Sequence, residues 1–126
     1  MTTAEAPVRR VSNADRDAAS KFATCLGLFE GINNIRAIHI RALLLICLDP
    51  GQAINELGAE LGITRATATR TLQQMTVNGR PGYPGWGLIF TKSGREMPGS
   101  DTRLVLVYPT EKGQELFKAL SQTMQQ

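Results

Sequence analysis

Apolar residues recur at the three- and four-residue spacing of an α-helix over most of this chain. A first helix is predicted to begin at Asn13 or Ala14 and to end before Gly31. Residues 35–48 predict a second helix, and its apolar residues on most sides indicate a central, buried position. The Asp-Pro-Gly that follows ends it, because proline cannot continue the hydrogen-bond ladder and glycine turns freely.

The next stretch predicts two helices joined by a glycine turn. Asn55 can cap a short helix, and Gly62 can adopt the left-handed conformation that ends it tightly. Thr64 can cap the following helix, which is predicted over residues 64–78 and places three apolar residues on one face: Ala68, Leu72 and Met75. A helix, a tight turn and a second helix form a helix-turn-helix.

The C-terminal part of the chain predicts a hairpin and then a helix. The stretch GRPGYPGWG predicts a loop, and GLIFTK and TRLVLVY predict two strands within residues 88–108, with SGREMPGSD as the polar tip between them. Thr110 can cap a last helix with an apolar stripe of Leu116, Phe117, Leu120 and Met124. The predicted fold class is α+β, mainly α: a winged helix-turn-helix with flanking N- and C-terminal helices.

Length and composition agree with a single folded unit. The 126 residues suit one compact domain, and an apolar fraction of 42% is enough for a core. We expect residues 1–13 to form a flexible arm and residues 14–126 a winged-helix domain with terminal dimerisation helices. Cys25 and Cys47 suggest neither a disulfide framework nor a zinc site, and no secretory signal is visible. These features favour a location in the cytoplasm, where cysteines stay reduced.

The formal net charge of +3 is unevenly distributed. Residues 62–103 contain six basic and two acidic residues, whereas the rest of the chain is close to neutral. The predicted helix at 64–78 has no acid at all, although solvated helix faces usually mix both signs. A helix that enters the major groove must not repel phosphates, and arginine and threonine can reach bases or phosphates. We therefore expect this helix to bind DNA through Arg65, Ala66, Thr67, Thr69, Arg70 and Gln74.

The stretch LGITRATATRTLQQMTVNG resembles the helix-turn-helix of the MarR family of bacterial winged-helix regulators, including the pair Thr69-Arg70 before Leu72. The later strand LVLVY and the Thr-Glu-Lys-Gly that follows at 110–113 are also similar to that family. The resemblance covers about residues 35–120. It implies binding of double-stranded DNA and regulation of transcription, with repression as the expected outcome.

The resemblance extends to the wing. In the MarR family an Asp-x-Arg feature organises the wing, and its arginine reaches the minor groove or the backbone. This implies a wing-organising role for Asp101 and a DNA contact for Arg103. Together with these, Lys92 and Arg95 are expected to contact DNA from the hairpin.

The terminal helices are expected to form a homodimer, because a winged-helix core alone cannot cover both of their apolar stripes. The expected dimerisation residues are Phe22, Leu26, Phe29, Leu116, Phe117, Leu120 and Met124. The alternative is that the two helices pack on each other within one chain. The chain departs from the family in a longer loop, RPGYPGWG, which is similar to that of shorter, phage-associated winged-helix proteins. It also ends at Gln126 without the further C-terminal helix that many members use in the dimer.

Other functions were weighed against DNA binding. A winged helix can instead bind proteins, as an anti-repressor or a polymerase-binding phage factor would, without sequence-specific DNA binding. The sequence offers few residues for an enzyme active site: His39 is the only histidine, and no catalytic residue, metal site or cofactor is predicted. A small-molecule effector and control by Cys25 oxidation stay open, without support from the sequence. Trp86 and Tyr83 are expected to pin the loop to the body rather than to stack on bases.

Overall fold

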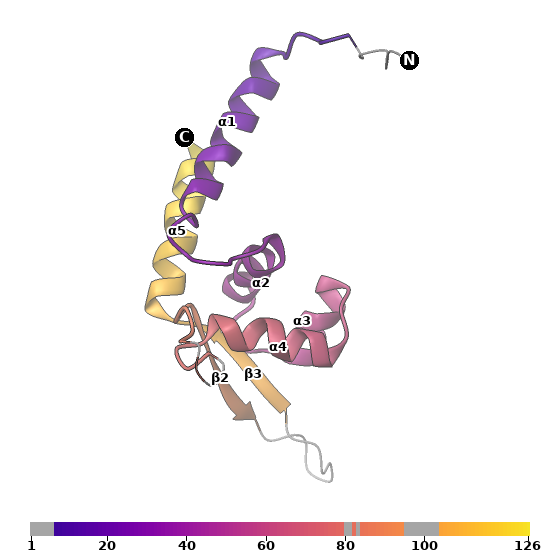
Figure 1. Cartoon of the computed structure of the whole chain (residues 1–126), viewed down its shortest axis with the longest axis vertical. Helices are drawn as coiled ribbons and strands as arrows, with labels where there is room; N and C mark the ends of the chain where they lie inside the picture. The colour runs from indigo at the N-terminus through magenta and orange to yellow at the C-terminus, as the bar shows by residue number, and fades with distance from the viewer. Residues whose placement is uncertain (1–6, 80–81, 83, 95–103) are drawn as a thin grey trace.

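The computed structural model describes residues 7–79, 82, 84–94 and 104–126. In that part of the chain five helices accompany one small sheet (Figure 1). The elements are α1 (Asn13–Gly27), α2 (Ala37–Leu48), β1 (Gln52–Ala53), α3 (Ile54–Leu61), α4 (Arg65–Met75), β2 (Ile89–Gly94), β3 (Leu104–Pro109) and α5 (Glu111–Gln125).

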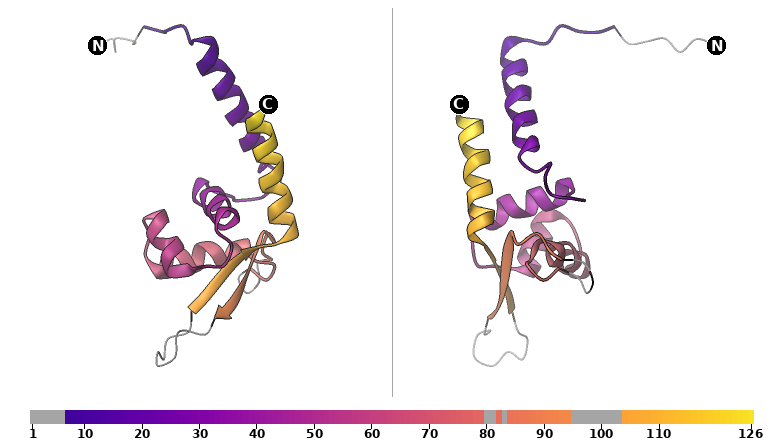
Figure 2. Two further views of the ribbon diagram at one scale, coloured as in Figure 1. Left: turned by 180° about the vertical axis from the view of Figure 1, so that it is seen from behind. Right: turned by 60° about the vertical axis from the view of Figure 1, so that its left-hand side comes forward.

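Helices α2, α3 and α4 and an antiparallel sheet make up the winged-helix body. The strand order is β1-β3-β2, and β2 and β3 pair from Ile89↔Pro109 to Gly94↔Leu104. Helices α1 and α5 rise side by side from this body, on the side opposite the Gly94–Leu104 end of the β2–β3 pair (Figures 1 and 2). The predicted fold class, a winged helix-turn-helix with flanking helices, is confirmed.

The core lies where α2 meets α3, α4 and the sheet. Three side chains of α2, those of Ala42, Leu43 and Ile46, are fully buried, so the predicted central position of this helix is confirmed. The other core side chains include Phe29, Leu57, Leu72, Met75, Leu88, Ile89 and Val107. Burial of each such side chain stabilises the fold by about 1.5–3 kcal/mol before the entropy of ordering is subtracted.

The turn between α3 and α4 forms as the sequence predicts. Gly62 has φ of 74°, a left-handed conformation that costs glycine nothing, and the N–H of Ile63 donates to the carbonyl of Gly58 at 2.9 Å. Thr64 caps α4, because its hydroxyl oxygen accepts the N–H of Thr67 at 3.2 Å. The roles predicted for Gly62 and Thr64 are confirmed.

The prediction that Asn55 caps α3 is wrong. The helix begins one residue earlier, at Ile54, and Ala53 is its N-cap without any side-chain hydrogen bond. The cause is β1, which the sequence did not reveal: Gln52 and Ala53 pair with Val107 and Leu106 of β3. This pairing holds the backbone extended up to residue 53, and the helix starts at the first residue released from it.

Two other helix boundaries differ from the prediction. Helix α2 begins at Ala37 rather than near Ile35, with Arg36 as its N-cap. Helix α4 ends at Met75, three residues before the predicted end at 78, because Thr76 is extended, with φ −79° and ψ 167°. The backbone leaves the helix there in order to pair with a later part of the chain.

That later part is the stretch Gly85–Leu88, called here the connecting segment. Its four N–H groups donate to four carbonyls at the end of α4 and just beyond it, at 2.8–3.3 Å. The pairs are Gly85 with Val77, Trp86 with Gln74, Gly87 with Thr76, and Leu88 with Met75. The last carbonyls of a helix have no partner within it. Thr76 donates to that of Gln73 through its N–H and its hydroxyl, and this segment supplies donors for the carbonyls of Gln74, Met75 and Thr76.

The other side of the connecting segment meets the start of α5. The N–H of Thr110 donates to the carbonyl of Leu88 at 3.0 Å, and the Thr110 hydroxyl donates to the carbonyl of Gly87 at 2.6 Å. The same hydroxyl accepts the N–H of Gly113 at 3.1 Å, so the predicted Thr110 cap is confirmed. Gly113 is required there, because a Cβ would lie 2.1 Å from the carbonyl oxygen of Leu88.

Replacing Gly113 by alanine should lower the free energy of unfolding by about 2–3 kcal/mol, because backbone of α5 and of the connecting segment must separate. Gly27→Ala is the matched control: it also lies in a helix, but no atom lies within 4 Å of its added Cβ. That change should be neutral or stabilise by up to about 1 kcal/mol. Urea unfolding measures both, and equal stability of the two variants would contradict the close approach.

Candidate nucleic-acid interface

Helix α4 has one buried face and one exposed face. Ala68, Leu72 and Met75 are at most 1% exposed and fix the helix on the core. The expected DNA-binding residues Arg65, Ala66, Thr67, Thr69 and Arg70 are all exposed. The structure therefore brings five of the six residues predicted on this helix together on a surface that contains no acid.

The hydroxyl groups on this surface are partly engaged by the helix itself. The Thr69 hydroxyl donates to the carbonyl of Arg65 at 2.9 Å, and the Thr64 hydroxyl donates to the hydroxyl oxygen of Thr67 at 3.0 Å. A threonine bonded in this way still presents an acceptor oxygen and a methyl group to its surroundings. The guanidinium groups of Arg65 and Arg70 are the strong donors of this face.

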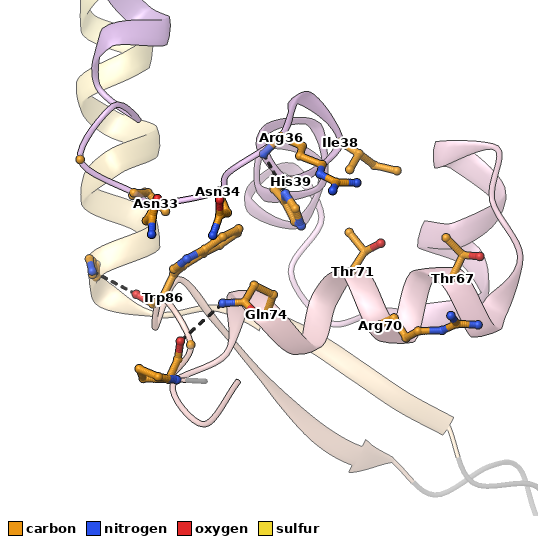
Figure 3. A pocket seen from close by; sticks show the side chains of 15 residues that line it. Asn33, Asn34, Arg36, Ile38, His39, Thr67, Arg70, Thr71, Gln74 and Trp86 are labelled. Atoms are coloured by element: carbon orange, nitrogen blue, oxygen red, sulfur yellow. Dashed lines mark hydrogen bonds between the residues drawn. The ribbon is translucent and has the colours of Figure 1, made fainter. Parts of the chain in front are cut away.

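Gln74, the sixth predicted residue on this helix, differs from the others. It is half-buried, and its Nε2 donates to the carbonyl of Pro84 at 3.4 Å, so its side chain points to the loop that precedes the connecting segment (Figure 3). Gln74 lies at the C-terminal end of α4, whereas a recognition helix usually enters DNA with its N-terminal residues. Its position suits support of the loop.

The expected wing residues are only partly described. Lys92 is exposed on β2, and its Nζ lies 5.7 and 5.4 Å from the ring centroids of Phe90 and Tyr108, which stack on each other. These rings lie on the sheet face that points away from the core. Arg95, Asp101 and Arg103 lie outside the described residues, so their roles stay predictions.

A cavity of about 830 Å³ opens beside the exposed face of α4 (Figure 3). Its walls come from α4, from the turn before α2, from the connecting segment and from the start of α5. Arg36, Arg70 and Lys112 line it, and no acidic residue is among the described residues of its walls. The cavity therefore adds positive charge beside the face that carries Arg65 and Arg70.

The sequence did not single out Arg36 or Lys112. Arg36 lies about 30 residues before α4 and Lys112 about 40 residues after it, and neither belongs to a basic cluster in the sequence. Only the tertiary fold brings their side chains to the same cavity as Arg70. The sequence alone could not predict that these two residues line the cavity, because an isolated arginine or lysine is usually just a solvated side chain.

His39 and Trp86 form the packed floor of this region. His39 is 8% exposed, and its Nδ1 accepts the backbone N–H of Arg36 at 2.9 Å. Its ring meets that of Trp86 edge-on, with centroids 4.7 Å apart. The expected role of Trp86 in pinning the loop to the body is confirmed. Burial, with the nearby charge of Arg36, lowers the pKa of His39 below its ordinary value of 6.5, so the ring is neutral and structural.

Among the described residues, no group of three or more metal-ligating side chains is present. In the same part of the chain, no helix is both long and apolar enough to cross a membrane. Cys25 is buried in α1, and its Sγ lies 3.6 Å from the carbonyl of Leu120, to which the thiol donates. Burial raises the pKa of the Cys47 thiol to about 11, so little of the reactive thiolate is present at neutral pH.

The fold matches solved structures of bacterial transcription regulators. RV1404 from Mycobacterium tuberculosis has a TM-score of 0.62 at 17% identity, over 89% of this chain and 67% of that chain. A MarR protein from Peptoclostridium difficile has a TM-score of 0.59 at 19% identity, over 96% and 74%. A protein described as a MarR-family transcriptional regulator from Listeria monocytogenes, complexed with 26mer DNA, has a TM-score of 0.55 at 26% identity, over 86% and 63%.

No protein-family model matches the sequence, and no curated protein matches it at a significant level. The chain spans about two thirds of the length of the solved structures that it resembles. At these identities the likeness establishes the fold: this chain has the winged helix-turn-helix of the MarR-like regulators. The predicted resemblance to that family is confirmed at this level. A solved structure of SlyA, like the Listeria structure, is described as a transcriptional regulator, which gives the enzyme alternative no support.

The pH dependence of folding should report the neutral state of His39. Its pKa is lowered in the folded chain, so as the pH falls below about 6.5 the unfolded chain binds the proton first and folding loses free energy. One such group contributes a slope of at most about 1.4 kcal/mol per pH unit. His39→Gln can keep an acceptor for the Arg36 N–H and does not titrate. Urea unfolding at pH 7.5 and pH 5 should show a smaller loss for this variant; equal losses would contradict the assignment.

Proposed function

We propose that this protein is a sequence-specific regulator of transcription that binds double-stranded DNA with α4 in the major groove. The observation that carries the proposal is the exposed, acid-free face of α4 on a MarR-like winged helix. The DNA complex of the Listeria regulator, a protein of the same fold, supports it by analogy. Repression is the proposed outcome, since a protein bound at promoter DNA competes with the polymerase for it.

The chemistry of this face suits base edges and phosphates. Arg65 and Arg70 can each form two parallel hydrogen bonds with a guanine or bind a phosphate oxygen. Thr67 and Thr69 offer acceptor oxygens and methyl groups, and the methyl group of thymine is an apolar partner for them. Ala66 is small, so the helix can approach the base edges without obstruction.

The residues around the face would strengthen contact with the DNA backbone. Arg36 lines the same cavity as Arg70 and adds a positive charge that no acid in its described walls offsets, whereas Nζ of Lys112 is bonded to the carbonyl of Trp86. Such charges bind phosphates without reading sequence, and they make affinity depend on salt. We propose Lys92, Arg95 and Arg103 as further contacts from the wing, organised by Asp101 as the family resemblance implies.

We also propose that the protein acts as a homodimer through α1 and α5. The two helices pack on each other within the chain, which covers part of both stripes: Leu116, Phe117 and Leu120 are half-buried. Phe29, one of the expected dimerisation residues, is 1% exposed in the core and offers no surface to a second copy. Phe22, Leu26 and Met124 are 59%, 42% and 44% exposed, and exposed apolar groups on both helices support an association surface.

Replacing Arg70 or Thr69 by alanine should weaken binding to a selected duplex by about 1–3 kcal/mol, if each side chain reads a base. The free energy of unfolding should hardly change, because both side chains are exposed. Lys118→Ala is the matched control, since it removes one exposed positive charge from α5. Fluorescence anisotropy measures the affinities. Unchanged affinity of the Arg70 variant would exclude α4 as the reading helix, and salt-independent or absent duplex binding by the unmodified protein would favour a protein-binding role.

Phe22→Glu should convert a dimer into a monomer, because it places a charge on the apolar surface of α1 while leaving the core of the chain intact. Leu48→Glu is the control: Leu48 is 71% exposed, but it lies on α2, away from the proposed interface. Light scattering at micromolar concentration gives the mass. A monomeric unmodified protein would exclude the dimer, and a dimer that survives Phe22→Glu would exclude this interface.

A further inference from the structure

The connecting segment, Gly85–Leu88, bonds to two helices at once. Its N–H groups donate to the end of α4, as described above, while its carbonyls face α5. The Thr110 hydroxyl donates to the carbonyl of Gly87 at 2.6 Å, and Nζ of Lys112 donates to the carbonyl of Trp86 at 3.0 Å (Figure 3). The segment is therefore a backbone bridge between the candidate reading helix and the C-terminal helix.

The contacts on both sides of this bridge are made by backbone at close range. A Cβ on Gly85 would lie 1.6 Å from the carbonyl oxygen of Thr76, and one on Gly113 would lie 2.1 Å from that of Leu88. No flexible side chain separates the three elements there. Because close-packed backbone deforms only at the cost of its hydrogen bonds, we expect a change in the position of α5 to be passed on to α4.

Direct packing between α4 and α5 plays a smaller part. Helix α5 packs mainly on α1, α2 and β3, whereas α4 packs mainly on α2, α3 and β2. The shortest polar route from one helix to the other runs through the connecting segment. Besides the backbone bond from the Thr110 N–H to the Leu88 carbonyl, two side chains contribute to that route, those of Thr110 and Lys112.

We propose that Thr110 and Lys112 are positioning residues for DNA binding: through the connecting segment they fix the angle between α4 and α5. The proposal rests on the proposed function and on the proposed dimer. In such a dimer α5 belongs to the interface and α4 reads the DNA, so this angle sets the distance between the two reading helices. Half-sites of dimeric helix-turn-helix proteins lie about one turn, or 10–10.5 base pairs, apart, so a small change of angle costs affinity for the paired site.

The test compares a palindromic duplex with a duplex that holds a single half-site. Thr110→Val and Lys112→Met each remove one donor to the bridge, and Thr110→Ser and Lys112→Arg retain a donor. Lys118→Met is the control for loss of a positive charge from the exposed side of α5. The affinities are measured for palindromes with the natural spacing and with one base pair added or removed.

The expected result is a loss of about two- to tenfold on the natural palindrome for Thr110→Val and Lys112→Met. Half-site affinity should stay unchanged, the preference for the natural spacing should become weaker, and Thr110→Ser and Lys112→Arg should restore both. A merely destabilised fold would lower half-site and palindrome affinity together, which would overturn the proposal. An equal loss on both duplexes for Lys112→Met alone would make Lys112 a phosphate contact instead.

Two further outcomes separate this proposal from the proposed function. If the unmodified protein binds the palindrome as a dimer and neither variant changes affinity or spacing preference, the positioning role is wrong and DNA binding stands. If the unmodified protein does not bind duplex DNA, or binds it as a monomer, the positioning role is overturned together with the assembly on which it rests.

Discussion

The end of helix α4 sets the constraint on which this structure depends. Its last carbonyls have no partner within the helix, and its C-cap residue, Thr76, donates only to that of Gln73. The connecting segment, Gly85–Leu88, supplies donors for the carbonyls that follow, from 8 to 13 residues further along the chain. Backbone hydrogen bonds hold the helix at its C-terminal end, and the core holds it along one face. Its other face is therefore not needed to pack on the core.

That freedom accounts for the composition of the exposed face. Ala68, Leu72 and Met75 carry the packing, so the outward positions can hold arginine, threonine and alanine without loss of stability. The connecting segment also brings Trp86 against His39, and both side chains line the cavity that Arg36, Arg70 and Lys112 line. The elements that hold the helix in place and the positive charges beside it therefore come from the same tertiary contacts.

Local signals in the sequence predicted much of the fold. Thr64, Gly62 and Thr110 act through bonds to residues three or four positions away, so their roles as caps and turns could be inferred from spacing alone. The start of α3 and the end of α4 could not, because β1 pairs with a strand more than 50 residues later and the connecting segment reaches back across the loop. Phe29 was expected at a surface between two copies for the same reason: helical spacing shows that a residue is apolar but not which partner covers it.

Selection of bound sequences from random duplex DNA tests the central claim most directly. If α4 reads the major groove and two copies bind together, the selected sequences should share a palindromic motif with half-sites about one turn apart. The contacted positions of that motif should lose their preference in the Arg70→Ala protein. Recovery of unrelated sequences, with no motif above the starting pool, would contradict sequence-specific recognition by this helix.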